Sequence, residues 1–277
     1  AGNAAGEAGP GVNTFDAPAT IPAEGGMNAP VTFTPADAAN YNTVALHVPV
    51  TVRPAPGEAR LFWQLPSGQT ACWIMNANGT LKSGSSVFAG ATAWLVRGAG
   101  DMDRDGVADL VWQLPTGQVL CWFMKTNGTA RSSVSIFAGT TTWVVRGAGD
   151  MDGDGVADLV WQLPTGQVAC WFMNTNGTAR SSASIFAGTT TWVVRGTGDM
   201  DGDGVADLVW QLPTGQVACW FMNTNGTARS SASIFAGTTT WVVRGTDDID
   251  RDGVTDLVWQ AASGQVVVWI MKADSAM

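Results

Sequence analysis

The chain has 277 residues, of which 45% are hydrophobic and only 13% are charged, so it can build a core and is not a disordered chain. Its 34 Gly and 14 Trp indicate turns and packed strands rather than long helices. The net charge of −9 argues against a nucleic-acid partner, which would need clustered Lys and Arg. No stretch approaches the ~20 apolar residues that span a bilayer.

The first 30 residues are rich in Ala, Gly, Asn and Pro and show no hydrophobic period, which predicts an extended tail over residues 1–30. The start of the chain lacks the charged and apolar regions of a signal peptide, so we expect a mature secreted chain or one lacking its leader. Directly after the tail, Val31 to Thr34 predicts a short strand.

The rest of the chain is a tandem repeat. Residues 150–198 and 199–247 are the same 49-residue sequence except at their last position, and residues 101–149 differ from them at only a few positions. Residues 53–100 are a diverged copy and residues 248–277 a truncated one. A period near 50 is typical of a propeller or a solenoid, in which each unit buries its faces only against its neighbours.

One repeat divides into four short strands separated by turn residues. In the blade that takes most of its residues from the copy 199–247, the strands are expected at Thr191–Arg195, Leu208–Leu212, Gln216–Met222 and Ala228–Phe235. The second and third are apolar on successive residues, which is typical of sheets covered on both faces. Each repeat therefore predicts one four-stranded antiparallel blade.

We predict an all-β fold, a five-bladed β-propeller over residues 31–277. The five first strands are expected at 42–52, 92–97, 141–146, 190–195 and 239–244. The last blade stops after its third strand, so we expect the strand at residues 31–35 to pair with this C-terminal blade and close the ring. The alternative is that this strand pairs with the last blade of another molecule.

Four acidic loops follow the pattern D-x-D-x-D-G-x-x-D and hold most of the chain's acidic residues. Their aspartates are Asp101, Asp103, Asp105, Asp109, Asp150, Asp152, Asp154, Asp158, Asp199, Asp201, Asp203, Asp207, Asp248, Asp250, Asp252 and Asp256. Spacing by two lets a curling loop aim several carboxylates at one point, and hard oxygen ligands suit Ca²⁺. The alternative is Asp-rich turns without a metal.

We expect four calcium sites and not five, because the aligned stretch of the first blade, Val52–Arg60, keeps only the Gly of the pattern. An EF-hand is excluded, since position twelve of the first loop is Trp112 and not a bidentate Glu. The sites are expected to be structural, so that chelation lowers the melting temperature.

A strand, the acidic loop and then Leu-Val-Trp at this period resemble the FG-GAP or VCBS repeats of integrin α-subunit propellers and of secreted bacterial proteins. Phe-Ala-Gly at 137–139, 186–188 and 235–237 is similar to the Phe-Gly half of that motif. The resemblance implies a calcium-binding propeller whose loops join the inner two strands of a blade. It also implies an extracellular location and a role in adhesion, sugar binding or scaffolding.

Three other residue types recur once in most blades. The cysteines Cys72, Cys121, Cys170 and Cys219 share a slot that holds Val268 in the last blade, so we expect buried free thiols. The arginines Arg97, Arg146, Arg195 and Arg244 are expected to form ion pairs with nearby carboxylates; the alternative is a ring of cations facing an anionic ligand. The first-strand tryptophans Trp94, Trp143, Trp192 and Trp241 either fill the core between blades or form stacking platforms for a sugar.

We predict no enzymatic activity, because the only His is His47 and no Glu lies in the acidic repeats to act as a general acid or base. The expected function is a secreted recognition or adhesion module with a carbohydrate, cell-surface or matrix ligand, whose repeated weak sites give avidity. The alternative is a self-assembling subunit of a filament or surface layer, a homo-oligomer connected through its N-terminal tail.

Overall fold

In the computed structural model, residues 11–15, 25–35, 44–52 and 58–273 are described. The chain divides into two compact units, Ala1–Ala55 and Pro56–Met277. All described elements are strands, and no helix among them is long and apolar enough to cross a membrane. The fold is therefore all-β.

The N-terminal unit is a three-stranded antiparallel sheet in the order β1-β2-β3. Its strands are β1 (Gly11–Phe15), β2 (Gly25–Pro35) and β3 (Val44–Val52). The segment predicted to close the ring lies in β2, where Val31 pairs with Phe15 on one side and with Leu46 on the other. Because both edges of β2 are thus paired inside this unit, the predicted closure by residues 31–35 is wrong.

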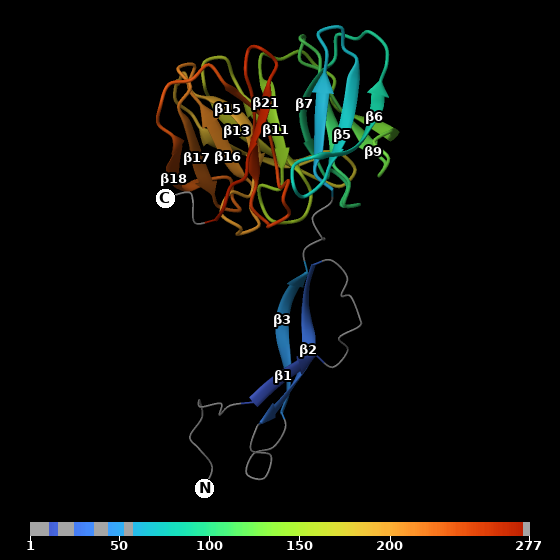
Figure 1. Ribbon diagram of the computed structural model, residues 1–277, viewed down its shortest axis with the longest axis vertical. Helices are drawn as coiled ribbons and strands as arrows, with labels where there is room; N and C mark the ends of the chain where they lie inside the picture. The colour runs from blue at the N-terminus through green and yellow to red at the C-terminus, as the bar shows by residue number, and fades with distance from the viewer. Residues whose placement is uncertain (1–10, 16–24, 36–43, 53–57, 274–277) are drawn as a thin grey trace. The chain divides into compact units, whose positions relative to one another are not determined.

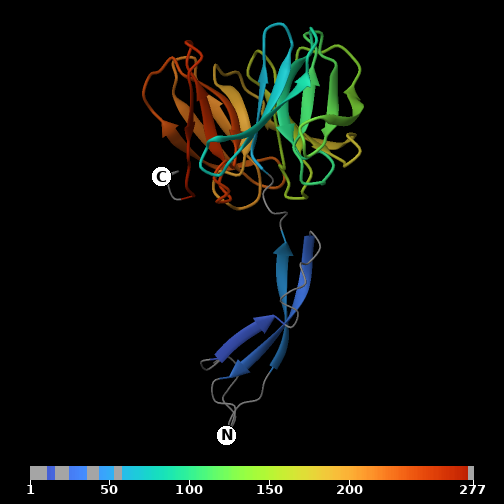
Figure 2. The same ribbon diagram turned by 45° about the vertical axis from the view of Figure 1, so that its right-hand side comes forward.

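The second unit is a five-bladed propeller, and its blades are antiparallel sheets arranged in a ring (Figures 1 and 2). Blade 1 has three strands, β4 (Arg60–Gln64), β5 (Thr70–Met75) and β6 (Leu81–Phe88). Blade 2 has four, β7 (Leu95–Gly100), β8 (Asp109–Gln113), β9 (Val119–Met124) and β10 (Ala130–Phe137).

The remaining blades follow the same pattern. Blade 3 is β11 (Val144–Gly149), β12 (Asp158–Gln162), β13 (Val168–Met173) and β14 (Ala179–Phe186). Blade 4 is β15 (Val193–Gly198), β16 (Asp207–Gln211), β17 (Val217–Met222) and β18 (Ala228–Phe235). Blade 5 is β19 (Val242–Asp247), β20 (Asp256–Gln260) and β21 (Val266–Trp269).

The first blade differs from its prediction. Residues 44–52, expected as its innermost strand, form β3 and pair with β2 in the N-terminal unit. The division between the two units accordingly falls after Ala55, and not after residue 30. Among the described residues, the three middle blades have four strands each, and the first and last blades have three.

The core lies between the blades, as the apolar runs of the second strands require. All five residues of β12 are buried, because each face of the sheet meets a neighbouring blade. Between blades 2 and 3, for example, Met102 and Cys121 pack with Leu159 and Trp161. Burial of such side chains contributes about 1.5 to 3 kcal/mol each.

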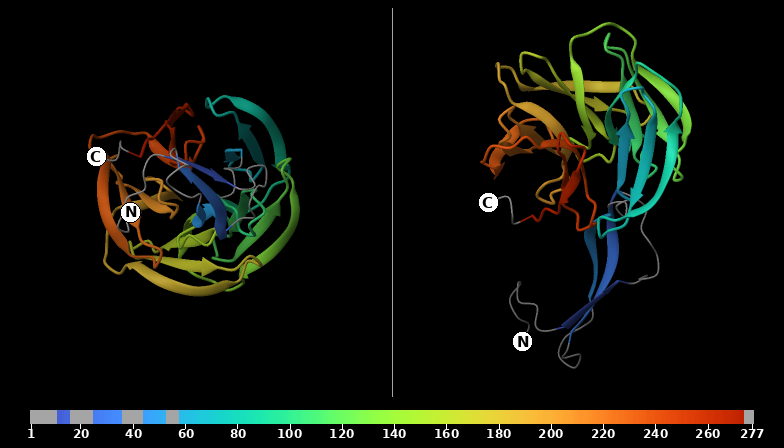
Figure 3. Two further views of the ribbon diagram at one scale, coloured as in Figure 1. Left: turned by 90° about the horizontal axis from the view of Figure 1, so that it is seen from below. Right: turned by 45° about the horizontal axis from the view of Figure 1, so that its top comes forward.

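The ring closes by packing of blade 1 on blade 5 (Figure 3). Ala59 and Met75 of blade 1 are buried together with Ile249 and Val258 of blade 5. The backbone N–H of Arg60 also donates to the Asp247 carboxylate of blade 5, at 2.8 Å. Side-chain packing and one long-range hydrogen bond therefore close the ring at this junction, in place of the shared strand that was expected.

Candidate functional site

Each acidic loop joins the innermost strand of a blade to its second strand, as the residue pattern predicts. The first loop runs between β7 and β8, and the other three lie at the same place in blades 3, 4 and 5. The four loops therefore lie at one rim of the propeller, one in each of four successive blades.

The first aspartate of each loop holds the turn in shape. Oδ1 of Asp150 accepts the backbone N–H groups of Gly153 and Asp154, at 2.7 and 3.1 Å, and its Oδ2 accepts that of Gly155 at 2.8 Å. Asp154 in turn accepts the N–H of Val156 at 2.9 Å. Aspartates favour such local bonds to the backbone, and these bonds curl the loop so that its carboxylates converge.

The last aspartate of the pattern is the most buried. Asp158 is fully buried, and its two oxygens accept the backbone N–H groups of Met173, at 2.7 Å, and Met151, at 3.0 Å. Burial raises the pKa of this carboxyl group to about 7, although the two N–H groups oppose the shift. Asp109 and Asp207 have equivalent contacts, and burial likewise raises the pKa of each to about 7.

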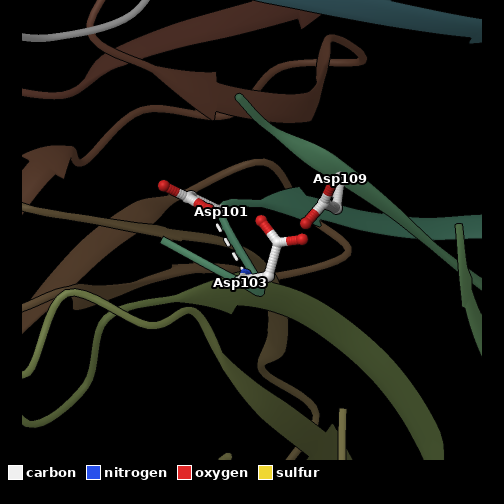
Figure 4. A group of neighbouring side chains, drawn as sticks. All are labelled: Asp101, Asp103 and Asp109. Atoms are coloured by element: carbon white, nitrogen blue, oxygen red, sulfur yellow. Dashed lines mark hydrogen bonds between the residues drawn. The ribbon is translucent and has the colours of Figure 1, made fainter. Parts of the chain in front are cut away.

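The second aspartate of each loop has an oxygen without a partner. In the first loop this residue is Asp103, which lies between Asp101 and Asp109 (Figure 4). Its Oδ1 is buried and accepts no hydrogen bond, and the same is true of Oδ1 in Asp152, Asp201 and Asp250. A buried carboxylate oxygen without a donor carries a substantial desolvation cost unless a cation contacts it.

The carboxylates of each loop are close enough to share one cation. In every loop, three aspartates each offer an oxygen atom, and these atoms lie within 4.8 Å of one another. The three are the first, second and ninth-position residues in the loops of blades 2, 3 and 5, and Asp199, Asp201 and Asp203 in blade 4. An all-carboxylate donor set with one unpartnered oxygen per loop fits a hard cation such as Ca²⁺.

A basic side chain faces each acidic loop, and the sequence analysis missed it. Arg180, at the start of β14, forms ion pairs with Asp152 and, at 2.7 Å, with Asp154. The equivalent cations of the other three loops are Arg131, Arg229 and Lys272. Arg131, Arg180 and Arg229 lie more than 20 positions after the last aspartate of their loops, but the turn between the third and fourth strands returns to the same rim. Lys272 follows β21, the third strand of blade 5.

Blade 1 keeps this ion pair but has no carboxylate cluster among its described residues. Lys82, at the position of Arg180, pairs with Glu58. At the position of the buried Asp158 stands Arg60, whose guanidinium donates to the backbone oxygens of Lys125 and Thr126 at 3.1 and 3.0 Å. A buried cation in place of a buried carboxylate disfavours a metal ion, consistent with four candidate sites and not five.

The ion pairs expected for the first-strand arginines are absent from the described residues. Arg97, Arg146 and Arg195 make no ion pair there, and the buried Nε atom of each has no hydrogen-bond acceptor. Arg244, at the same position in blade 5, is exposed and has no carboxylate partner in the described part of the chain. The role predicted for these four arginines belongs instead to Arg131, Arg180 and Arg229 at the start of the outer strands and to Lys272 after β21.

The four cysteines are buried free thiols, as predicted. Burial raises the pKa values of Cys72, Cys121, Cys170 and Cys219, which keeps them protonated and poorly reactive. Cys121, Cys170 and Cys219 pack in the cores between blades.

Two clefts lined by tryptophan open at blade junctions. The larger, about 570 Å³, lies between blades 3 and 4, and its aromatic walls come from Phe186, Trp192, Trp210 and Trp220. The second, about 210 Å³, lies between blades 4 and 5 and contains the equivalent set with Trp241. Two of the four candidate platform residues therefore line clefts.

The other two candidates, Trp94 and Trp143, pack against the cores of their own blade junctions. Trp192 and Trp241 also pack against the cores of their junctions, so all four first-strand tryptophans contribute to the core between blades, and a role as sugar platforms stays a prediction. In each four-stranded blade the tryptophan of the third strand meets the Phe of the preceding blade edge to face, as in the pair Phe186 and Trp220 with ring centroids 6.0 Å apart. This contact builds the wall of the cleft.

A model of the FG-GAP-like repeat matches residues 150–210 and 199–259. These residues are FG-GAP-like repeats. The matched segments contain three of the acidic loops, and the fourth, in blade 2, belongs to a repeat that is nearly identical in sequence. The FG-GAP-like repeat thus accounts for the blades and for the loops together.

Solved structures align with the chain at low similarity. A Bacteroides uniformis protein named as a 6-phosphogluconolactonase is 15% identical over 90% of this chain and 76% of that one, with a TM-score of 0.39. The Nup133 β-propeller domain of Vanderwaltozyma polyspora is 8% identical over 93% of this chain and 82% of that one, with a TM-score of 0.34. No curated protein matches the sequence. At this similarity the alignments carry no conclusion about activity.

Proposed function

We propose that this FG-GAP-like propeller is a non-catalytic, extracellular recognition module that binds carbohydrate at its blade junctions, with calcium in its four acidic loops. The observation that supports it best is the repeated aromatic cleft. Sugar rings present an apolar face that stacks on tryptophan and a rim of hydroxyl groups that needs polar partners.

The cleft between blades 3 and 4 has the size and the lining for this ligand class. Its volume of about 570 Å³ is within the range of small-molecule sites, about 300 to 1,000 Å³. Trp210 in its lining is buried, while Trp192 and Trp220 are half-buried and leave ring surface accessible. Gln216 and Ser231 add polar groups at the edge.

The same positions recur one blade later, so the propeller offers related sites side by side. Trp241, Trp259 and Trp269 take the places of Trp192, Trp210 and Trp220. Neighbouring weak sites raise the overall affinity for a ligand that spans them, such as a polysaccharide. A role in adhesion to a glycan-bearing surface or matrix follows from this arrangement.

The metal belongs to this proposal as a structural element. Asp103, Asp152, Asp201 and Asp250 supply the unpartnered oxygens. The first and last carboxylates complete the donor set in blades 2, 3 and 5, and Asp199 and Asp203 complete it in blade 4. Calcium bound there neutralises converging carboxylates and fixes the rim that carries the inner strands. We assign it no part in activating water, because protein carboxylates fill the site.

The carbohydrate proposal is tested on a glycan array with Ca²⁺ present, followed by titration of the best glycan. The variants W192A and W241A are expected to weaken binding by about tenfold or more each, since stacking is lost. W73A is the matched control, because Trp73 is 40% exposed on blade 1 and lines neither cleft. No binding to any glycan, or equal loss in W73A, would contradict the proposal.

The alternative, a self-assembling structural subunit, is favoured by the outer edge of the last blade. Strand β21 has no strand on its outer side among the described residues. Val266, Val267, Trp269 and Ile270 there are between 38% and 44% exposed. Open apolar edges invite pairing with another chain. Light scattering and negative-stain microscopy, with Ca²⁺ and with EDTA, separate discrete 29 kDa particles from filaments.

A further inference from the structure

The innermost strands of blades 2 to 5 carry one arginine each at the same position. Arg97, Arg146, Arg195 and Arg244 lie on β7, β11, β15 and β19. In each strand the regular pairing with the second strand is interrupted at this residue, so that the arginine forms a β-bulge. Bulges redirect a side chain away from the regular alternation of the sheet.

These strands approach one another closely beside the arginines. A Cβ atom on Gly147, directly after Arg146, would lie 2.9 Å from Cγ2 of Thr197 on the next inner strand. The hydroxyl of Thr246 donates to the backbone oxygen of Thr197 at 2.7 Å, which ties β19 to β15. The inner strands β7, β11, β15 and β19 therefore lie side by side, and each carries its arginine at the same position.

Among the described residues, no protein anion forms an ion pair with these arginines. All the ion pairs between the described residues of the propeller involve other cations, on the outer strands of blades 1 to 4 or directly after β21. The Nε atoms of Arg97, Arg146 and Arg195 are buried and unpartnered. Burial lowers the pKa values of all three, and the neighbours Arg97 and Arg195 lower that of Arg146 further.

Arg97, Arg146 and Arg195 are half-buried, and Arg244 beside them is exposed. Neighbouring like charges that are unpaired and partly buried are unfavourable unless a ligand compensates them. The planar guanidinium group donates in pairs to the oxygens of sulfate, phosphate or carboxylate groups. We propose that the ring formed by Arg97, Arg146, Arg195 and Arg244 binds an oxyanion on the axis of the propeller. This site is separate from the acidic loops and uses different residues from the aromatic clefts.

The oxyanion that the arginines bind has two candidate sources, a free inorganic anion and the acidic group of a sugar chain. Inorganic sulfate and a short sulfated oligosaccharide therefore serve as separate probes, titrated calorimetrically at constant ionic strength with 2 mM Ca²⁺ present. We expect saturable binding of one anion group per chain. Tighter binding of the oligosaccharide than of sulfate assigns the site to an acidic sugar chain, and equal affinities assign it to the free anion.

The deciding variant is Arg146→Met, which removes the charge with neighbours on both sides and keeps an apolar stem. It is expected to weaken binding of both probes by at least about tenfold, as loss of a charge-assisted pair does. The control is Lys125→Asn, because Lys125 is exposed and the identical position is Asn174 in the next blade. This control removes the same charge and is expected to change affinity by less than about twofold.

Thermal unfolding without added oxyanion gives a second readout. Arg146→Met is expected to melt at a higher temperature than the unchanged protein, since it relieves repulsion, and to lose the stabilisation by sulfate that Lys125→Asn keeps. Arg195→Met repeats the test on the next inner strand. The proposal is overturned if the arginine variants bind the probes as well as Lys125→Asn does, or if neither probe binds saturably.

Discussion

The side-chain amide of Gln162 joins its blade to the next one by donating from Nε2 to the backbone oxygen of Trp192, at 2.9 Å. Its Oε1 accepts the backbone N–H of Val194, at 3.2 Å. The end of β12 in blade 3 is thereby fixed to the innermost strand of blade 4. The same pair of bonds links Gln64, Gln113 and Gln211 to their next blades.

The variant Gln162→Met is expected to lower the free energy of unfolding by about 2 to 4 kcal/mol, because the backbone groups of Trp192 and Val194 lose their partner in a buried junction. Gln260→Met is the matched control. Gln260 ends the second strand of blade 5 but makes no such bond among the described residues, so its replacement is expected to cost less than about 0.5 kcal/mol. Urea unfolding followed by tryptophan fluorescence measures both, and equal costs would show that Gln162 does not hold the blades together.

The blades could be predicted from the sequence because their information is local and repeated. Apolar runs and Gly positions predict the four strands of a middle blade and the turns between them. The burial of Cys170 follows from Val268, the apolar residue at the same position of the last blade. The loop that curls around Asp150 also depends on neighbours within a few residues. Period and spacing decide such features without knowledge of distant contacts.

The features that could not be predicted depend on which distant segments meet. Residues 31–35 are a strand, as expected, but no residue pattern within this segment indicates that it pairs with β1 and β3. Arg146 is four residues from Asp150 in sequence, yet Arg180 pairs with that loop because the blade folds back to the same rim. Gln162 resembles any polar residue at a strand end until its partner in the next blade is known.

Calcium is expected to stabilise the propeller through the acidic loops. If each site binds with a dissociation constant of about 0.1 to 1 mM, ~2 mM Ca²⁺ adds roughly 0.6 to 1.8 kcal/mol per site. Excess EDTA should therefore lower the melting temperature measured by calorimetry. A melting curve that EDTA leaves unchanged would contradict the metal assignment.

A single loop tests the donor set. Asp152→Asn replaces the carboxylate whose Oδ1 has no partner and is expected to reduce calcium bound per chain from four ions to three, measured by equilibrium dialysis. In EDTA the same variant should be about as stable as the unchanged protein, because relief of the unpartnered Oδ1 offsets the loss of the partly exposed ion pair with Arg180. Glu58→Gln is the control, since Glu58 lies outside the four clusters; loss of an ion there as well would count against the assignment.

The buried aspartates predict an unusual pH dependence of the metal-free protein. Burial raises the pKa values of Asp109, Asp158 and Asp207 from 3.8 to about 7. At a pH between these two values, the folded state therefore binds more protons than the unfolded state. Their contribution to stability is present below about pH 4 and is lost as the pH rises toward 7.

In EDTA, the melting temperature is thus expected to fall from pH 5 to pH 7.5. In excess Ca²⁺, which favours the ionised carboxylates, the fall should be smaller or reversed. Melting curves at constant ionic strength across this range test both. A melting temperature in EDTA that rises steadily over the same range would show that these carboxyl groups do not titrate as described.

The fourth position of each acidic loop has left-handed backbone geometry, which Gly adopts in two blades and Arg in two. Gly153 and Gly202 have φ values of 77° and 80°, whereas Arg104 and Arg251 have 64°. A residue with a Cβ atom is strained there by about 1 to 2 kcal/mol. Arg104→Gly is therefore expected to raise the free energy of unfolding by about 1 kcal/mol, partly offset by the greater freedom of Gly in the unfolded chain.

Arg104→Ala separates backbone strain from charge, because it removes the same guanidinium group but keeps the Cβ atom. The Ala variant is expected to gain little free energy of unfolding. Urea unfolding with Ca²⁺ present measures both variants, and the difference between their free energies of unfolding is the backbone strain. Arg251→Gly repeats the measurement in blade 5, where the φ value is the same. If Ala and Gly stabilise equally, the gain comes from removing a cation beside the carboxylates, and the left-handed geometry costs nothing measurable at this position.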